Sequence, residues 1–173
     1  MGISQDIHME LMLPCAVADA WRAIADQKAL SGWFMDNDFQ PRLHHKFLFR
    51  KPPQRGWDGL THCEVIELEP PFRLAFTYRG KATGEKVLAC AGVESETTLS
   101  SGKGLFAELD TILRFELSPA RSSAGVEFTR LTLTHSGFKG WKMVLVSLVM
   151  AAGWRKILRH RLIAFIENTG RTA

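Results

Sequence analysis

A long apolar stripe near the carboxyl end most constrains the fold of this chain. Between Trp154 and Ile166 the apolar residues follow one another at spacings of three and four, as in a helix with one buried face. Several earlier segments alternate with the period of two that is typical of strands. A run of strands followed by one long helix predicts an α+β fold, because it leaves no helices for βαβ crossovers. We expect the helix to cover one face of a curved antiparallel sheet.

Strand-like alternation is clearest in Ile7–Leu13, where every second residue is apolar. In the last predicted strand the parity changes between Phe128 and Leu131. This change predicts a β-bulge near Thr129 and Arg130. Further strands are predicted around Phe47 and Phe49 and in residues 72–78, 108–117 and 126–135.

Two short helices are predicted after the first strand. Residues 17–25 place apolar side chains on one helical face, and Asp26 is positioned to cap a second helix running toward Trp33. Residues 80–103 are polar and contain Gly, Ser and Thr, so we interpret them as a hairpin insertion with one short strand. No repeat is visible, and residues 1–173 are predicted to form a single domain that carries this insertion.

Composition and charge exclude several classes of protein. The chain is 46% hydrophobic and 23% charged, which excludes disordered and collagen-like proteins. A net charge of +4 is too small by itself to predict nucleic-acid binding. Cys15, Cys63 and Cys90 are widely spaced and form no C-x-x-C pair, so no disulfide framework is predicted. The amino terminus lacks the pattern of a secretory signal, which predicts a cytoplasmic protein.

The longest apolar run covers residues 143–154 and is too short to cross a bilayer, which takes about 20 residues. We therefore expect no stable membrane insertion. Residues 143–152 are interpreted instead as a lid-like part of the helix. The positive residues that follow, from Arg155 to Arg161, leave contact with an anionic surface open.

The common catalytic, cofactor and metal motifs are missing. The string GKGLFA at residues 102–107 matches G-x-G-x-x-A but lacks the preceding strand and following helix of a dinucleotide site, so no cofactor is predicted. His44 and His45 are adjacent on a strand and point to opposite faces, so no metal site is predicted. The sequence contains no G-x-S-x-G, H-E-x-x-H or P-loop pattern. We assign no catalytic residue and expect a protein that is not an enzyme.

Three strings and one dipeptide carry a family resemblance. They are VADAWRAIADQKALSGWF at 17–34, EVIELEPPFRLAFTY at 64–78, LTLTHSGF at 131–138 and Gly153-Trp154. In this order the chain resembles the family named for the activator of the heat-shock-protein-ninety ATPase (AHSA-type), within the START and Bet v 1-like (SRPBCC) helix-grip superfamily. The resemblance covers the whole chain apart from the insertion. It implies a seven-stranded sheet wrapped around the carboxy-terminal helix, with an apolar cavity between them.

The resemblance also implies a function, because superfamily members use this cavity to bind lipids, hormones and aromatic natural products. We expect non-catalytic binding of a small hydrophobic or aromatic ligand. A co-chaperone-like protein interaction with a chaperone partner stays open, as does a polyketide cyclase-like or hydrolase-like enzyme using His135 and Tyr78. A homodimer formed through the insertion or the apolar run is open as well.

The alternation and the implied fold together predict the residues that line or border the cavity. For each aromatic residue, a place in the filled core is the alternative. His135, in phase with Leu131 and Leu133, either orients a ligand or is a structural histidine bonded to the turn that follows it. Arg161 borders the apolar stripe, and we hypothesise that its guanidinium meets a ligand carboxylate at the cavity mouth. The predicted ligand-binding residues are Trp33, Phe34, Phe49, Trp57, Phe76, Tyr78, His135, Trp154, Leu158, Arg161 and Leu162.

Overall fold

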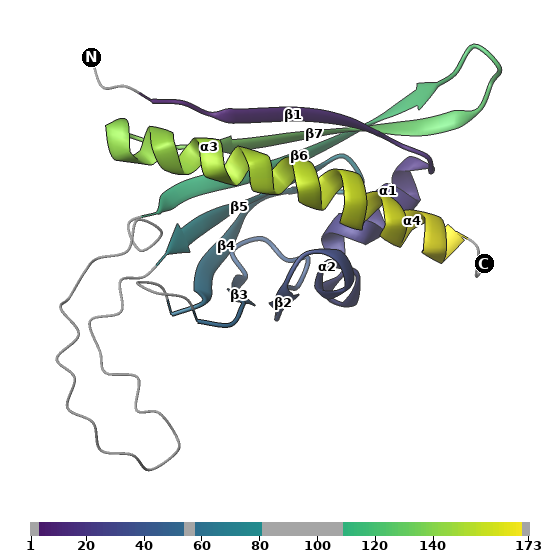
Figure 1. Ribbon diagram of the computed structural model, residues 1–173. Helices are drawn as coiled ribbons and strands as arrows, with labels where there is room; N and C mark the ends of the chain where they lie inside the picture. Colours follow the sequence, from purple (N-terminus) through teal and green to yellow (C-terminus); the bar gives the residue numbers. More distant parts are fainter. Residues whose placement is uncertain (1–3, 54–57, 81–108, 171–173) are drawn as a thin grey trace, which may run out of the picture.

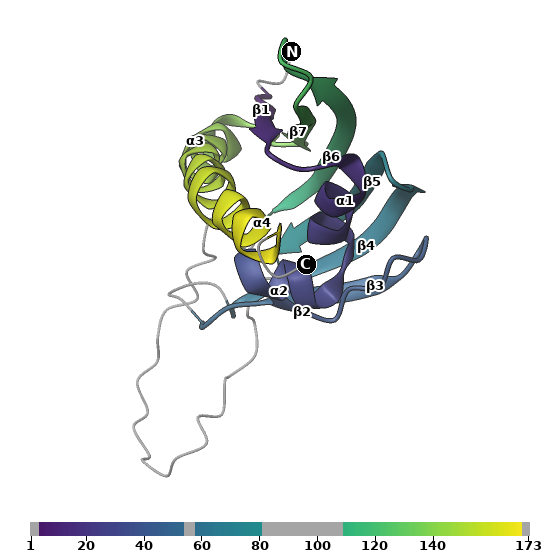
Figure 2. The ribbon, with the colours of Figure 1, turned by 90° about the vertical axis from the view of Figure 1, so that its right-hand side faces the viewer.

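The computed structural model describes residues 4–53, 58–80 and 109–170, and within them seven antiparallel strands form one sheet. The strands are β1 (Ile7–Leu13), β2 (Asp36–Asn37), β3 (Lys46–Arg50), β4 (Leu60–Glu69), β5 (Arg73–Gly80), β6 (Asp110–Arg121) and β7 (Glu127–Ser136). Their order across the sheet is β1-β7-β6-β5-β4-β3-β2. Figure 1 and Figure 2 show the sheet curving around the carboxy-terminal helix. The predicted α+β helix-grip fold is confirmed.

The described helices are α1 (Val17–Ala25), α2 (Gln27–Trp33), α3 (Trp141–Lys156), the π-helical segment η2 (Ile157–Leu162) and α4 (Ile163–Gly170). Asp26 caps α2, since its Oδ1 accepts a hydrogen bond from the Ala29 N–H at 2.9 Å. This cap agrees with the sequence prediction. The last three elements follow one another without a break and form the long helix of Figure 1.

The two short helices are fastened to each other and to the end of the long helix. The indole N–H of Trp33 donates to the Ala23 carbonyl oxygen at 2.8 Å. Gly32 makes room for the Phe165 ring, because a Cβ at this position would lie 2.9 Å from Phe165 Cε2. Trp33 is therefore a structural core residue that joins α1 and α2.

The predicted bulge near Thr129 is wrong. β6 and β7 pair through this position without a register shift. Val126 lies in the turn before β7, and Phe128 points to the opposite face from the buried Thr129, so the parity of the strand never changes. A register shift occurs instead between Val65 and Glu67, where β4 pairs with β5.

The long helix keeps one stripe of side chains against the sheet by changing its pitch. Trp154, Leu158, Leu162 and Ile166 are buried and lie four residues apart. A four-residue spacing exceeds the 3.6-residue turn of an α-helix, so such a stripe drifts around an α-helix. The wider π turn in η2 brings it back toward the sheet. The same change leaves Arg161 exposed.

Some sequence predictions concern parts of the chain outside the described residues. These are the insertion at 80–103, except Gly80 at the end of β5, together with Trp57 and Cys90. Within the described ranges, no helix is both long and apolar enough to cross a membrane. The same ranges contain no group of three or more His, Cys, Asp or Glu side chains that could hold a metal ion.

Candidate functional site: a pocket between the long helix and the sheet

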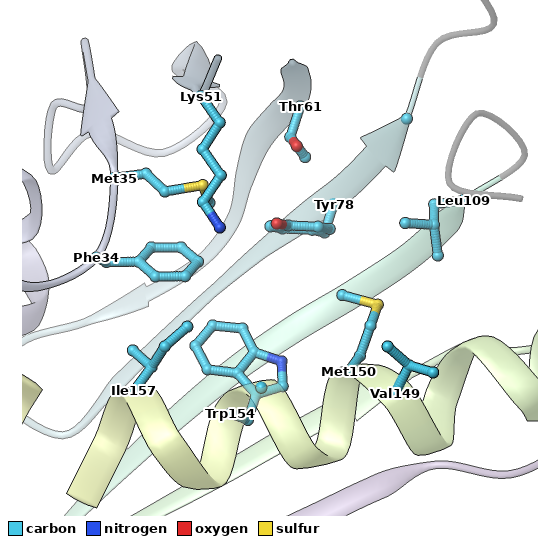
Figure 3. A pocket seen from close by; sticks show the side chains of 12 residues that line it. Phe34, Met35, Lys51, Thr61, Tyr78, Leu109, Val149, Met150, Trp154 and Ile157 are labelled. Carbon is cyan, nitrogen blue, oxygen red and sulfur yellow. The ribbon is translucent and has the colours of Figure 1, made fainter. Parts of the chain in front are cut away.

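A pocket of about 240 Å³ lies between α3 and the sheet (Figure 3). Met150 and Trp154 come from α3, Tyr78 comes from β5, and Phe34 and Met35 follow α2. The volume is slightly below the usual range of ligand pockets, about 300–1,000 Å³, so the space suits a small molecule. The remaining lining residues are Lys51, Thr61, Gly80, Leu109, Val149, Gly153 and Ile157.

Phe34 and Trp154 form an aromatic wall of this pocket. Their rings are stacked, with centroids 5.0 Å apart and planes at 25°. Behind them, Phe49 meets Phe34 edge-on at 4.9 Å. Such stacked and edge contacts are favourable and hold the rings in fixed orientations. The pocket therefore has a rigid apolar wall.

Three polar side chains interrupt the apolar lining. Thr61 lies on β4 and Tyr78 on the neighbouring β5, and both side chains line the pocket. Burial raises the pKa of Tyr78 far above its ordinary value, so the phenol stays protonated at neutral pH. Lys51 follows β3 and is exposed, and Figure 3 shows its ammonium group pointing toward the pocket. Lys51 carries the only charge among the lining residues that the structure describes.

The position of Lys51 is fixed by the turn region between β3 and β4. The Lys51 N–H donates to the Gly59 carbonyl oxygen at 2.9 Å. Gly59 has a φ of +82°, and a Cβ on it would lie 2.1 Å from the Lys51 carbonyl oxygen. Only glycine fits both the backbone conformation and the close approach. The local sequence thus holds a lysine at the rim of the pocket.

His135 sits in a buried polar network behind the pocket. The Trp154 indole N–H donates to His135 Nδ1 at 3.2 Å. The Thr111 hydroxyl donates to the Tyr78 carbonyl oxygen at 2.8 Å and lies 2.8 Å from His135 Nε2. The Thr111 hydroxyl proton is already donated to the Tyr78 carbonyl oxygen, and Nδ1 of His135 accepts the proton of the Trp154 indole. Nε2 therefore carries the ring proton and donates to the Thr111 oxygen. Burial lowers the pKa of His135 to about 3, so the ring is neutral at physiological pH.

This network favours the structural interpretation of His135 over a ligand-orienting one. The residue has no exposed surface, and both ring nitrogens have protein partners. The partners are Trp154 on α3 and Thr111 on β6, whereas the sequence analysis placed them in the turn after His135. The imidazole therefore joins three elements of the fold.

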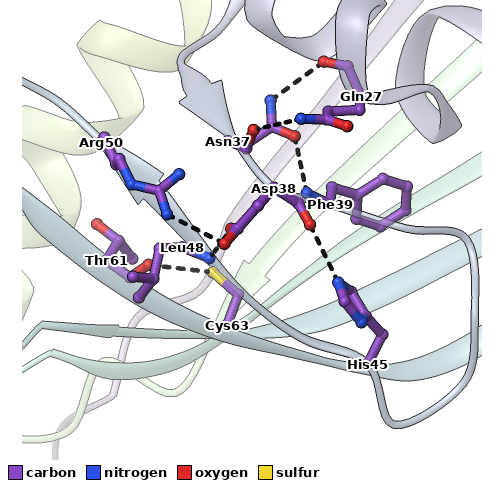
Figure 4. A network of polar contacts seen from close by, with 9 residues as sticks. All are labelled: Gln27, Asn37, Asp38, Phe39, His45, Leu48, Arg50, Thr61 and Cys63. Carbon is purple, nitrogen blue, oxygen red and sulfur yellow. Dashed lines mark hydrogen bonds and ion pairs between the residues drawn. The ribbon is translucent and has the colours of Figure 1, made fainter.

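A second polar network, part of which is drawn in Figure 4, fixes the backbone that carries Phe34 and Met35. Asn37 donates through Nδ2 to the Met35 carbonyl oxygen at 2.9 Å. Gln27 donates through Nε2 to the Asn37 carbonyl oxygen at 2.9 Å, so α2 and β2 are joined. The backbone that carries two pocket residues is thereby fixed to α2.

Asp38 extends this network to β3. Its carboxylate accepts the Leu48 N–H at 2.7 Å and pairs with the Arg50 guanidinium at 3.0 Å. Burial alone acts to raise the pKa of Asp38, but the hydrogen bonds from Leu48 and Arg50 outweigh it and lower the pKa below its ordinary value. Asp38 therefore helps to hold the short strand β2 beside β3.

The structure brings three of the predicted site residues to the pocket, namely Phe34, Tyr78 and Trp154. Arg161 is exposed and does not line it. Trp57 lies outside the described residues. The other predicted residues are buried in the core without lining the pocket, and they are Trp33, Phe49, Phe76, His135, Leu158 and Leu162.

Several lining residues were missed by the sequence analysis. Lys51 and Thr61 belong to no periodic pattern that distinguishes them from other surface or strand residues. Val149 and Met150 lie in the apolar run that was interpreted as a lid. That run was the sequence feature that pointed to the α3 side of the pocket. Met35 follows Phe34 directly, but adjacency to a predicted lining residue does not show that the Met35 side chain also points toward the cavity.

A sheet that grips a long helix, with a mostly apolar pocket between them, defines a helix-grip protein with room for a small ligand. The model of the family described as "Activator of Hsp90 ATPase homolog 1-like protein" matches residues 14–167. The chain belongs to this family, which confirms the resemblance found in the sequence. Comparison with curated proteins gives no match.

Solved structures share this fold at low sequence identity. Protein MLL2253 from Mesorhizobium loti has a TM-score of 0.69 and 21% identity, with 95% of this chain and 98% of that chain covered. Protein BH1534 from Bacillus halodurans has a TM-score of 0.65 and 22% identity, covering 96% and 99%. The Aha1 dimer from Colwellia psychrerythraea has a TM-score of 0.58 and 15% identity, covering 89% and 90%. At these identities the likeness concerns the fold.

Proposed function

We propose that the protein binds a small apolar or aromatic molecule in the pocket between α3 and the sheet. The observation that carries this proposal is the pocket itself, about 240 Å³ in volume and walled by Phe34 and Trp154. Flat apolar walls with a few polar groups are typical of ligand sites. Among the described residues, every buried side-chain nitrogen and oxygen already has a hydrogen-bond partner. The buried polar groups therefore need no ligand to satisfy them, and the apolar wall supplies the contact surface for one.

The charge at the rim favours a ligand with an acidic group. Lys51 points toward the pocket, and no carboxylate in the described part of the chain pairs with it. A ligand carboxylate could therefore pair with the ammonium group while its apolar body contacts Phe34 and Trp154. Thr61 adds a hydroxyl on the same side. Small aromatic acids combine these properties.

Calorimetric titration with 1-naphthylacetamide tests occupancy of the pocket without any contribution from charge. Gly153→Leu should weaken binding about tenfold, equivalent to about 1.4 kcal/mol, because its side chain grows into the lining. The backbone tolerates the change, since a Cβ at Gly153 has nothing within 4 Å. Ala152→Leu, at an exposed neighbouring position of α3, is the control. Failure of the wild-type protein to bind, or equal binding by both variants, would contradict the proposal.

A second titration compares 1-naphthylacetate with its amide. Lys51→Met should weaken binding of the acid about tenfold and leave binding of the amide unchanged, while Lys51→Arg should keep both. Lys46→Met is the matched control, because Lys46 is exposed on β3 and does not line this pocket. If the wild-type protein bound the acid and the amide equally well, the proposed preference for an acidic ligand would be wrong. The proposed binding of an apolar ligand would still stand.

The two other functions considered from the sequence rest on different observations. Family membership supports the co-chaperone-like interaction, and stimulation of an Hsp90 ATPase by the purified protein would test it directly. The cyclase-like or hydrolase-like enzyme gains no support from His135, whose ring is enclosed, neutral and fully hydrogen-bonded. A cytoplasmic location, a homodimer and a single domain over residues 1–173 stay predictions from the sequence.

A further inference from the structure

The outer side of α3 is apolar, although its inner side already forms part of the core. The exposed fractions are 65% for Trp141, 52% for Leu145, 53% for Leu148 and 64% for Val149. These residues are four, three and one positions apart, so they share one helical face, and Val149 lies at the edge of this face where it also borders the pocket. We call them the outer face. A helix on a globular protein ordinarily turns polar residues to this side, and a contiguous exposed apolar patch marks a contact with something else.

The outer face continues into a row of cations. From Leu148 the same side of the helix runs through Ala152 to Arg155 and Arg159, at spacings of four, three and four. Both arginines are exposed, as is Lys156 beside them. None of these three cations has an ion-pair partner among the described residues.

The charge of this region is one-sided. Residues 139–166 contain six lysines and arginines and neither aspartate nor glutamate, while the whole chain has a net charge of +4. At the amino-terminal end of α3, the Lys142 ammonium lies 5.8 Å from the centre of the Trp141 ring. Cations therefore lie at both ends of the apolar patch, and an indole lies at one of them.

We propose that the outer face docks on an anionic lipid surface, with α3 parallel to it. Apolar side chains would enter the boundary between headgroups and acyl chains, and the cations would contact anionic headgroups. Trp141 is suited to this boundary because its ring is amphipathic. Figure 2 shows the sheet on one side of the long helix, and no other helix or strand that the structure describes covers the far side. A single exposed helix with apolar side chains between cations fits the boundary of an anionic lipid surface better than it fits a folded acidic partner.

Co-sedimentation of the full chain with vesicles tests this proposal. Binding is expected to vesicles of phosphatidylcholine with phosphatidylglycerol, and not to vesicles of phosphatidylcholine alone. Added salt should weaken it, because screening reduces attraction between exposed charges. No binding to the anionic vesicles would overturn the proposal.

Paired variants identify the surface responsible. Leu145→Gln with Leu148→Gln should weaken vesicle binding roughly tenfold, because apolar burial is lost. Neither residue lines the pocket, so naphthylacetamide binding should be unchanged. The control pair is Met12→Gln with Val126→Gln, two residues of similar exposure on the sheet side.

A second pair separates charge from apolar contact. Arg155→Gln with Arg159→Gln should weaken binding to anionic vesicles roughly tenfold. The control is Arg121→Gln with Arg130→Gln, which removes the same charge from exposed positions of β6 and β7. If the test pair and the control pair lost the same amount of vesicle binding, the effect would be one of net charge alone. The proposal that the outer face docks on the membrane would then be wrong.

Two other occupants would also overturn it. A dimer that is stable in sedimentation velocity and dissociates in the Leu145→Gln, Leu148→Gln variant would assign the face to a second copy of this chain. Hsp90 ATPase stimulation that is lost in the same variant, without vesicle binding by the wild-type protein, would assign it to a protein partner. Circular dichroism and thermal melting of each variant confirm that the fold is kept.

Discussion

The indole N–H of Trp154 and the Nδ1 of His135 lie 3.2 Å apart where the long helix meets strand β7. The same indole ring lines the pocket and stacks on Phe34. Trp154 therefore serves both the pocket wall and the attachment of α3 to the sheet. Changes in this network should be measurable as changes in stability, independently of any ligand.

The buried imidazole predicts a pH dependence of stability. The pKa of His135 is about 3 in the folded protein and about 6.5 in an unfolded chain. Between these values the unfolded chain binds more protons, so stability is fully present above pH 6.5 and falls as the pH decreases. The contribution decreases by about 1.4 kcal/mol per pH unit in this window.

His135→Gln removes this titration while keeping an amide donor near Thr111. The variant should be less stable than the wild-type protein at about pH 7.5, and the difference should shrink by about 1.4 kcal/mol at about pH 5.5. Urea denaturation at both pH values measures it. A difference that stays constant with pH would show that His135 does not titrate on unfolding in this range.

The Thr111 hydroxyl is the second link in the network. Thr111→Val keeps the shape of the side chain but leaves the Tyr78 carbonyl and His135 Nε2 without their partner. The free energy of unfolding should fall by about 1–3 kcal/mol. Thr132→Val, at a half-buried position on the opposite face of β7, should change it by less than about 0.5 kcal/mol. Equal losses would mean that the hydroxyl bonds contribute nothing specific.

The fold could be predicted because it depends on period and order. Alternation in Ile7–Leu13 and the apolar stripe after Trp154 each indicate which side of an element is buried. Both patterns can be recognised from a single sequence. The resemblance then supplied the topology. The misplaced bulge near Thr129 arose because Val126 and Phe128 are apolar and were taken to face the core, whereas Val126 precedes β7 and Phe128 points to the opposite face from the buried Thr129.

The site was less predictable because it depends on contacts between distant segments. His135 contacts Thr111, which lies 24 residues away in the chain, and no local sequence pattern predicts that contact. Arg161 was expected at the pocket from α-helical spacing, but the π turn of η2 changes the direction of its side chain. Lys51 reaches the rim through a backbone approach to Gly59 that the letters of the sequence do not show.

The close approach of Gly59 to the Lys51 backbone allows a test of how the position of Lys51 is fixed. Gly59→Ala combines an unfavourable positive φ with a Cβ 2.1 Å from the Lys51 carbonyl oxygen. Gly125→Ala shares a positive φ of +78° but meets nothing within 4 Å, so it should cost only the backbone strain, about 1–2 kcal/mol.

Gly59→Ala should therefore cost clearly more in chemical denaturation than Gly125→Ala. It should also weaken binding of 1-naphthylacetate, because the backbone that carries the ammonium group must move. Similar stability losses in the two variants would show that the close approach is relaxed at little cost, and that Gly59 does not set the position of Lys51.

Gly153 lies in α3 at the pocket lining, where stability and binding should oppose each other. Glycine inside a helix is less stable than alanine by roughly 0.5–1 kcal/mol, and a Cβ here has nothing within 4 Å. Gly153→Ala should therefore raise the melting temperature. The added methyl group narrows the pocket, so naphthylacetamide should bind more weakly in calorimetry. Because Ala152 already occupies the exposed neighbouring position, Ala152→Gly is the reverse control and should lower stability without affecting binding. If Gly153→Ala raised stability and left affinity unchanged, the space beside Gly153 would not be part of the site that the ligand uses.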